Sequence, residues 1–297
     1  IAAAISFWRP DILKEELEGI VLWQKIIAAI LVGIGLSLMI FGQIPQVDLN
    51  RRVNWGVTFS DKFSRELGLN PKENLVAILD DLRVKKIRLI AYWDNIEKEK
   101  NIFDFSNLDW QINEAKKRNA EIIIAIGMKV PRWPECHIPD WAIMLSTQER
   151  ERELRLYLEE IVERYKDNKT IKIWQIENEP FLPLGECPER EKNFVSNEVS
   201  LIKSLDNSRQ ILITESGELG FWPRAAEYGD VFGTTMYRRV HNKYFGQINY
   251  HLPPEFFILK EKATRFFIKD HGKKFIVIEL AAEPWMAKQI YETTIEE

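Results

Sequence analysis

Seven short apolar runs alternate with longer amphipathic stretches from residue 54 onward, and this alternation restricts the chain to few folds. Each run has the length of a buried strand. Each longer stretch, such as SNLDWQINEAKKRN at 106–119, has apolar positions three or four residues apart with charges between them. Repeated βα units of this kind predict a parallel sheet covered by helices. The predicted strands are Asn54–Phe59, Lys86–Ala91, Glu121–Gly127, Ile171–Ile176, Gln210–Thr214, Asp230–Met236 and Phe275–Leu280.

Seven strands in a single-domain length predict an α/β fold, the (β/α)8 TIM barrel, which needs roughly 250 residues for eight units. The eighth strand is expected beyond Glu297, so this fragment of the barrel lacks its last repeat. A doubly wound open sheet is the alternative, but no Gly-rich phosphate turn follows any of the predicted strands. We therefore favour the barrel.

One segment near the start has a different character. No charged residue occurs from Ile26 through Val47, a span of 22 residues that is long enough to cross a bilayer. A cleaved signal peptide and a buried helix are the alternatives, but no clear small-residue cleavage site follows the span. The predicted organisation is an N-terminal flank at 1–25, a transmembrane anchor at 26–47, a linker at 48–53 and a barrel domain at 54–297.

Composition excludes several classes of function. The formal net charge is −4, so there is no basic field that would attract nucleic acid. Four histidines stand at isolated positions and two cysteines have no metal-type spacing, so neither a metal site nor an organic cofactor is expected. Carboxylates must then carry any acid/base chemistry. No sequence feature indicates an oligomeric state.

Two glutamates end predicted strands. The fourth strand runs into Glu177-Asn178-Glu179-Pro180, and the seventh runs into Glu279. Active sites of such barrels form at the carboxyl ends of the strands, where these two strands can face each other. Hydrolysis of a glycosidic bond with retention needs one carboxylic acid and one nucleophilic carboxylate. We predict Glu179 as the general acid/base and Glu279 as the nucleophile. The alternatives are Glu177 for the acid, and Glu283 or Glu215 for the nucleophile.

A buried cation is expected beside such a nucleophile, because a positive charge keeps a buried carboxylate ionised. Arg88 lies inside the otherwise apolar second strand, KIRLIA, where an unpaired guanidinium would be very unfavourable. It is the predicted partner of the nucleophile. A structural ion pair elsewhere is the alternative.

At these motifs the chain resembles the clan of retaining glycoside hydrolases, clan A, that includes many cellulases, β-galactosidases and β-xylosidases. The resemblance covers about residues 54–285 and includes Asn178-Glu179-Pro180, Glu279, and the segment from Arg88 to Glu97 with the segment 101–109 after it. It implies that Asn178 hydrogen-bonds a sugar 2-hydroxyl. It also implies that Tyr237, near the end of the sixth strand, supports the nucleophile together with Arg88.

Tryptophan is unusually abundant, with ten in 297 residues. Four of them follow predicted strand ends, where exposed indole faces could stack on sugar rings, although core packing is an alternative for each. These predicted substrate-binding residues are Trp93, Trp133, Trp222 and Trp285. As a set they favour a saccharide groove.

The two cysteines bear on location. Cys136 and Cys187 follow the third and fourth predicted strands, on the same face of the barrel, so a disulfide between them is geometrically possible. If formed, it implies an oxidising compartment. That would agree with a membrane-anchored protein whose catalytic domain lies outside the cytoplasm.

Three functions compete on this basis. The leading hypothesis is an enzyme that hydrolyses a β-linked oligo- or polysaccharide by double displacement, with carbohydrate as its substrate and the membrane as its other contact. The second is a membrane-anchored, non-catalytic glycan-binding barrel. The third is a metal-dependent lyase or isomerase with Glu177, Glu179 and Glu215 as ligands, which is disfavoured because such sites usually include histidines.

Overall fold

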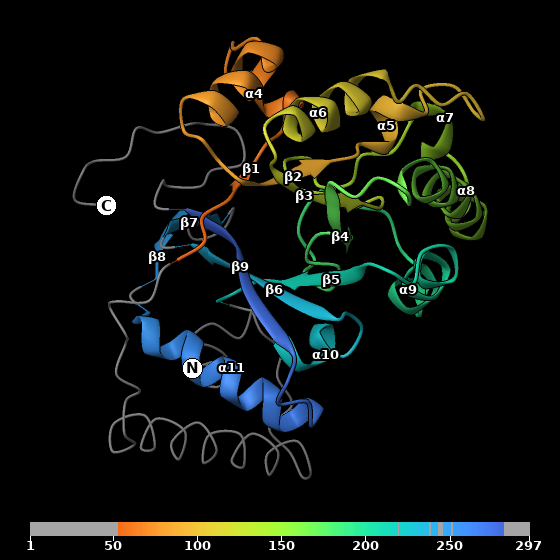
Figure 1. Ribbon diagram of the computed structural model, residues 1–297. Coiled ribbons are helices and arrows are strands. Elements are labelled where there is room, and N and C mark those ends of the chain that lie inside the picture. The colour runs from red at the N-terminus through yellow and green to blue at the C-terminus, as the bar shows by residue number, and fades with distance from the viewer. Residues whose placement is uncertain (1–52, 219, 238, 243–245, 251, 282–297) are drawn as a thin grey trace, which may run out of the picture. The chain divides into compact units, whose positions relative to one another are not determined.

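The protein is built around one curled parallel sheet (Figure 1). The computed structural model describes residues 53–281, except 219, 238, 243–245 and 251. In this part, seven strands follow the order β1-β2-β3-β4-β5-β6-β9, and every neighbouring pair is parallel. All seven predicted strands are present. They are β1 Val57–Thr58, β2 Lys86–Ile90, β3 Glu121–Ile126, β4 Ile171–Ile176, β5 Gln210–Glu215, β6 Val231–Tyr237 and β9 Lys274–Ala281.

The sheet curls into a nearly closed barrel. Arg88 in β2 contacts Glu279 in β9, although these strands stand near opposite ends of the sheet order. Such a contact requires the two ends of the sheet to face each other, which confirms the predicted α/β barrel. The position predicted for the eighth strand lies outside the described residues.

Helices pack along the outside of the sheet (Figure 1). Their ends follow local sequence signals: Ser146 and Glu149 form a reciprocal capping box at the start of α8, and Asn70 caps α4 just before Pro71. The helices are α3 Asp61–Glu66, α4 Pro71–Asp80, α5 Trp93–Ile96, α6 Ser106–Lys117, α7 Asp140–Ile143, α8 Thr147–Tyr165, α9 Phe194–Leu205, α10 Trp222–Ala226 and α11 Pro254–Ile268.

None of the helices within the described ranges is long and apolar enough to cross a membrane. The predicted anchor at 26–47 lies outside those ranges.

The core between sheet and helices is largely apolar, and the buried polar side chains of the strands lie mainly toward their carboxyl ends. Side chains such as Leu89 and Ile124 are fully buried in the middle of their strands. Buried polar residues replace them toward the strand ends, namely Gln175, Thr214, Thr234 and Thr235. The fold therefore gathers hydrogen-bonding groups at one end of the barrel, where an active site is expected.

Two details differ from the predicted elements. β7 (Arg239–Asn242) and β8 (Gly246–Asn249) form an antiparallel hairpin between β6 and α11 that was not predicted, because their four-residue sequences, RVHN and GQIN, carry no strong alternation. β1 is also shorter than predicted, since residues 54–56 are exposed and lie outside the sheet.

Candidate active site

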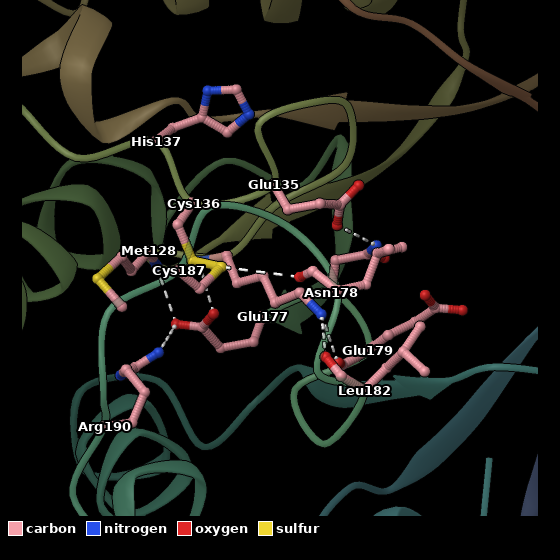
Figure 2. The surroundings of a disulfide bond; sticks show 12 residues. Met128, Glu135, Cys136, His137, Glu177, Asn178, Glu179, Leu182, Cys187 and Arg190 are labelled. Atoms are coloured by element: carbon pink, nitrogen blue, oxygen red, sulfur yellow. Dashed lines mark hydrogen bonds and ion pairs between the residues drawn. A yellow bond between two sulfur atoms is a disulfide. The ribbon is translucent and has the colours of Figure 1, made fainter. Parts of the chain in front are cut away.

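The turn after β4 directs Glu177 and Glu179 to different sides (Figure 2). Glu177 is fully buried and accepts hydrogen bonds from the backbone amides of Met128 (2.9 Å) and Lys129 (2.7 Å). Gly127 permits this approach, because a Cβ at that position would lie 2.6 Å from Glu177 Oε1. The carboxylate of Glu177 therefore fixes the loop after β3 against β4 and does not point to the nucleophile candidate.

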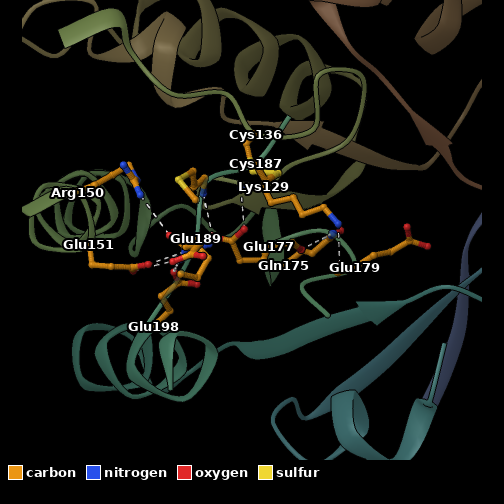
Figure 3. A network of polar contacts seen from close by, with 12 residues as sticks. Lys129, Cys136, Arg150, Glu151, Gln175, Glu177, Glu179, Cys187, Glu189 and Glu198 are labelled. Atoms are coloured by element: carbon orange, nitrogen blue, oxygen red, sulfur yellow. Dashed lines mark hydrogen bonds and ion pairs between the residues drawn. A yellow bond between two sulfur atoms is a disulfide. The ribbon is translucent and has the colours of Figure 1, made fainter. Parts of the chain in front are cut away.

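A buried ion network completes the environment of Glu177. Arg190 contacts the carboxylates of Glu177 (3.1 Å), Glu151 (2.6 Å) and Glu198 (2.5 Å). Figure 3 shows how these three glutamates converge behind the loop that follows β4. Burial and the charge of Glu177 raise the pKa of Glu198. The network anchors the loop that carries Glu179, and it accounts for Glu177 without a catalytic role.

Glu279 lies in β9 immediately after a break in the strand register. Val277 pairs with Thr234, whereas Glu279 pairs with Thr235, so Ile278 is the extra residue. Such a bulge changes the direction of the side chain that follows it. It turns Glu279 toward Arg88 and Tyr237.

Glu279 is held as an anion. Arg88 Nη1 donates to Glu279 Oε1 at 2.5 Å, and the hydroxyl of Tyr237 donates to Oε2. Burial raises the pKa of Glu279, but the charge of Arg88 and the hydrogen bonds from Tyr237 and Arg88 outweigh it, so that the pKa lies below its usual value. An ionised, hydrogen-bonded carboxylate is what a nucleophile requires.

Glu179 has the opposite electrostatic setting. Its side chain is 7% exposed, and Thr235 Oγ1 donates to its Oε1 at 2.9 Å. Burial, followed by the negative charges of Glu279 and Glu135, raises its pKa well above the usual range. This setting favours the protonated form of Glu179, which is the form that a general acid uses.

Thr235 places Glu179 close to Glu279. It is the sheet neighbour of Glu279 and hydrogen-bonds Glu179. Two carboxyl groups whose pKa values are shifted in opposite directions thus lie near each other at the carboxyl end of the barrel. This pairing can protonate a leaving oxygen while a carboxylate attacks.

Asn178 contacts both Arg88, the partner of Glu279, and a third carboxyl group, that of Glu135. Its Oδ1 accepts a hydrogen bond from Arg88 Nη2 at 2.8 Å, and its Nδ2 lies 3.5 Å from Glu135 Oε2. Arg88 is 2% exposed. Its guanidinium binds both Glu279, the nucleophile candidate, and Asn178, the residue before Glu179. The structure brings together Arg88, Asn178, Glu179, Tyr237 and Glu279, as the sequence predicts.

The tryptophans divide into two groups. Trp93 is fully buried against Tyr157 and donates to Glu97 Oε2, and Trp222 is 2% exposed and donates to Ser216 O. Neither indole has a face open to a sugar, so the prediction that these two bind substrate is wrong: both sit at the start of a short helix and turn into the core. Trp133 is half-buried, and Trp285 lies outside the described residues.

Two other carboxyl candidates can also be placed. Glu215 ends β5 and accepts a hydrogen bond from the amide of Ser216 at 3.0 Å, and burial raises its pKa, which does not favour a nucleophile. Glu283 lies outside the described residues.

Three residues of the site were not predicted. Thr235 is one of two threonines in β6, and only the register shows which of them faces Glu179. Lys129 Nζ donates to the carbonyls of Glu179 (2.9 Å) and Leu182 (2.8 Å), and so holds the turn after β4. Glu135 lies in the loop after β3, well beyond the strand end where site residues were sought.

A disulfide joins the loop that carries Glu135 to the loop that follows Glu179 (Figure 2). Cys136 and Cys187 are bonded, with their Cα atoms 5.2 Å apart. The bond that the sequence left as a possibility is present, and it links the loop after β3 to the loop after β4.

A parallel βα barrel with paired carboxyl groups at its strand ends is the fold of the clan that the sequence resembles, and comparison with solved structures supports this at the level of fold. The family 10 endo-β-1,4-xylanase of Gloeophyllum trabeum superposes with a TM-score of 0.55 at 15% identity, over 81% of this chain and 74% of that chain. The GH5_18 protein of Streptomyces cattleya, solved in complex with GlcNAc, superposes with a TM-score of 0.53 at 11% identity, over 78% and 71%.

One curated relative is similar in sequence. The β-galactosidase BgaA of Clostridium cellulovorans is 26% identical over 190 residues, which cover 56% of this chain and 29% of the relative. The chain thus matches less than a third of the length of that protein. No protein-family profile matches the chain.

Proposed function

We propose that this protein is a retaining glycoside hydrolase of β-linked oligo- or polysaccharides, with Glu179 as general acid/base and Glu279 as nucleophile. One observation carries the proposal: two neighbouring carboxyl groups have environments that shift their pKa values in opposite directions, each with a separate structural cause. Burial keeps Glu179 protonated, whereas Arg88 and Tyr237 keep Glu279 ionised. Divergent pKa values in a carboxyl pair define acid and nucleophile roles.

In the proposed mechanism Glu279 attacks the anomeric carbon while Glu179 gives its proton to the leaving oxygen. A glycosyl ester forms on Glu279. Loss of the proton leaves Glu179 as a base, which then takes a proton from the water that cleaves the ester. Asn178 Nδ2 is available to hydrogen-bond the sugar 2-hydroxyl, because Arg88 fixes the amide by holding its oxygen.

The substrate class rests on the relatives and on one aromatic side chain. The similar proteins are named as a β-galactosidase, a xylanase and a GlcNAc-bound GH5_18 protein, so a β-linked sugar is a reasonable first substrate. Trp133 is half-buried and stands two residues before Glu135. Among the predicted tryptophans that lie in the described part of the chain, its indole is the one that can stack on a sugar ring.

The test is hydrolysis of a panel of aryl β-glycosides by the full chain and its Glu179→Ala and Glu279→Ala variants. Both variants should lose turnover, and azide should rescue each with a different product: an α-glycosyl azide from Glu279→Ala and a β-glycosyl azide from Glu179→Ala. Glu160→Gln, at an exposed position of α8, is the matched control and should retain full activity. Identical products from both variants would overturn the assignment of roles.

A non-catalytic glycan-binding barrel is the second candidate. It predicts sugar binding without turnover of any glycoside, which the same panel detects. A metal-dependent lyase is less consistent with the site, because the oxygens of Glu177, one of its three ligands, are taken by two amides and Arg190. Loss of activity on chelation would favour it.

We also propose that residues 26–47 form a membrane anchor and that the barrel domain lies outside the cytoplasm. The Cys136–Cys187 disulfide supports an oxidising compartment. Membrane fractionation, combined with protease treatment of intact cells, tests both parts. Recovery of the protein in the soluble fraction would contradict the membrane anchor. Protection of the barrel from protease would contradict its location outside the cytoplasm.

A further inference from the structure

Glu135 brings a third carboxyl group, itself buried, to the site. Its side chain comes from the loop after β3 and is 7% exposed. Burial is the main reason why its pKa is raised to about 7; Lys129 opposes this shift and the charge of Glu279 adds to it. The charge of Glu135 in turn contributes to the raised pKa of Glu179. Three carboxyl groups therefore lie close enough to influence one another's pKa values, and the proposed mechanism uses two of them.

The backbone around Glu135 is held in place by several contacts. Its backbone is left-handed, with φ of 72°, a conformation that is unfavourable for a residue with a side chain. Its amide donates to Arg132 O (2.8 Å), and its carbonyl accepts from the amide of Val130 (2.9 Å). Gly185 packs directly against it, because a Cβ on Gly185 would lie 2.5 Å from the Cβ of Glu135. The next residue, Cys136, is tied to Cys187 by the disulfide.

Such a position points the carboxyl group at Asn178. Figure 2 shows one oxygen of Glu135 turned to the Asn178 amide, and the other with no partner drawn. The contact to Asn178 Nδ2 is long, at 3.5 Å, and in the described part of the chain it is the sole hydrogen bond of this carboxyl group. A buried carboxyl group with a weak partner retains most of its capacity to accept hydrogen bonds.

We propose that Glu135 is a specificity-determining residue that accepts a hydrogen bond from a hydroxyl of the sugar bound next to Glu179 and Glu279. Glu135 lies beside Asn178 Nδ2. The sugar hydroxyl that Glu135 binds is therefore expected next to the hydroxyl that Asn178 binds. A sugar that lacks this hydroxyl leaves a buried carboxyl group without its partner and is selected against. This inference rests on the proposed hydrolase function.

The experiment pairs enzyme variants with monodeoxy substrates. The kcat/KM values of the full chain, Glu135→Ala and Glu135→Gln are measured on the best aryl β-glycoside and on its 2-, 3-, 4- and 6-deoxy analogues. Glu135→Ala should lower kcat/KM on the parent sugar by about 10- to 100-fold, the usual effect of a lost hydrogen bond to a charged group. On one deoxy analogue the variant and the wild type should differ by less than about threefold, because neither can make the contact.

Controls separate this result from a structural effect. Glu135→Gln is nearly isosteric and keeps an acceptor oxygen, so it should retain more activity than Glu135→Ala. Glu186→Ala, at an exposed position on the facing loop, should behave as wild type. An equal loss on every substrate would make Glu135 a structural residue and overturn the inference alone. No hydrolysis of any glycoside by wild type would overturn the proposed function and this inference with it.

Discussion

Arg88 in β2 donates a hydrogen bond of 2.5 Å to Glu279 in β9, across the interior of the barrel. The two strands stand near opposite ends of the sheet order, so this contact exists only because the sheet curls. The same guanidinium binds Asn178, the residue before Glu179. One buried cation therefore connects the nucleophile candidate to the turn that carries Glu179, the candidate acid.

Replacing Arg88 by methionine should lower kcat/KM by about 10²- to 10³-fold, the range seen when one preorganised electrostatic contact is removed from an active site. Without the positive charge, the pKa of Glu279 rises, and the acidic limb of the pH–rate profile should move to higher pH. The profile of kcat/KM against pH measures both effects. Arg65→Met, which removes a guanidinium that is 55% exposed and lies outside the candidate site, is the control. An acidic limb that stays in place would contradict the pairing.

The pH profile of the wild type should be bell-shaped. Activity requires Glu279 ionised, and this is lost as pH falls through its lowered pKa; it also requires Glu179 protonated, and this is lost as pH rises through its raised pKa. Glu179→Gln should remove the alkaline limb when the substrate is a dinitrophenyl glycoside, whose leaving group needs no acid. If the alkaline limb persists in that variant, another group provides it.

Glu177 and Glu179 should differ when each is changed to glutamine. In Glu177→Gln an NH₂ group faces one of the two backbone amides that the carboxylate now accepts from, and Arg190 loses a buried partner. Breaking such a buried pair costs about 3–5 kcal/mol. The melting temperature should fall clearly for Glu177→Gln and little for Glu179→Gln, as calorimetry can show. Equal melting temperatures would refute the structural role of Glu177.

Much of this site could be predicted because strand ends and burial leave clear signals. Glu279 directly follows an apolar run, Glu179 is the third residue after one, and a charged residue such as Arg88 inside an apolar strand requires an opposite charge. Glu135 could not be found in this way. Its place depends on a left-handed backbone and a disulfide between distant loops, neither of which has a local periodicity.

The wrong predictions for Trp93 and Trp222 have a related cause. A residue that follows a strand lies at the correct end of the barrel, but its side chain direction depends on the next turn of the backbone. In both cases a short helix begins at the tryptophan and turns the indole into the core, where its N–H finds an acceptor.

Glu135 should make stability depend on pH. Its pKa is about 7 in the folded protein, and a free glutamate has a pKa of about 4.3. Because the folded-state pKa is raised, the stability contribution of the protonated group is complete below the unfolded pKa and is lost as pH rises toward 7. Glu135→Gln has no such group. The melting temperature of Glu135→Gln relative to wild type should therefore increase from pH 5 to pH 8, and a constant difference would contradict the raised pKa.

The disulfide should affect both stability and activity. It links residues 51 positions apart, and a bond that closes a loop of this size typically stabilises a folded chain by about 2–4 kcal/mol. It also holds Glu135, which precedes Cys136, against Gly185. We expect the Cys136→Ser, Cys187→Ser double variant to melt at a lower temperature. Below its melting temperature it should resemble Glu135→Ala in substrate discrimination, with a reduced preference for the parent sugar over one deoxy analogue. A variant that melts earlier but keeps the wild-type preference would show that Gly185 and the backbone hydrogen bonds of Glu135 suffice to position it.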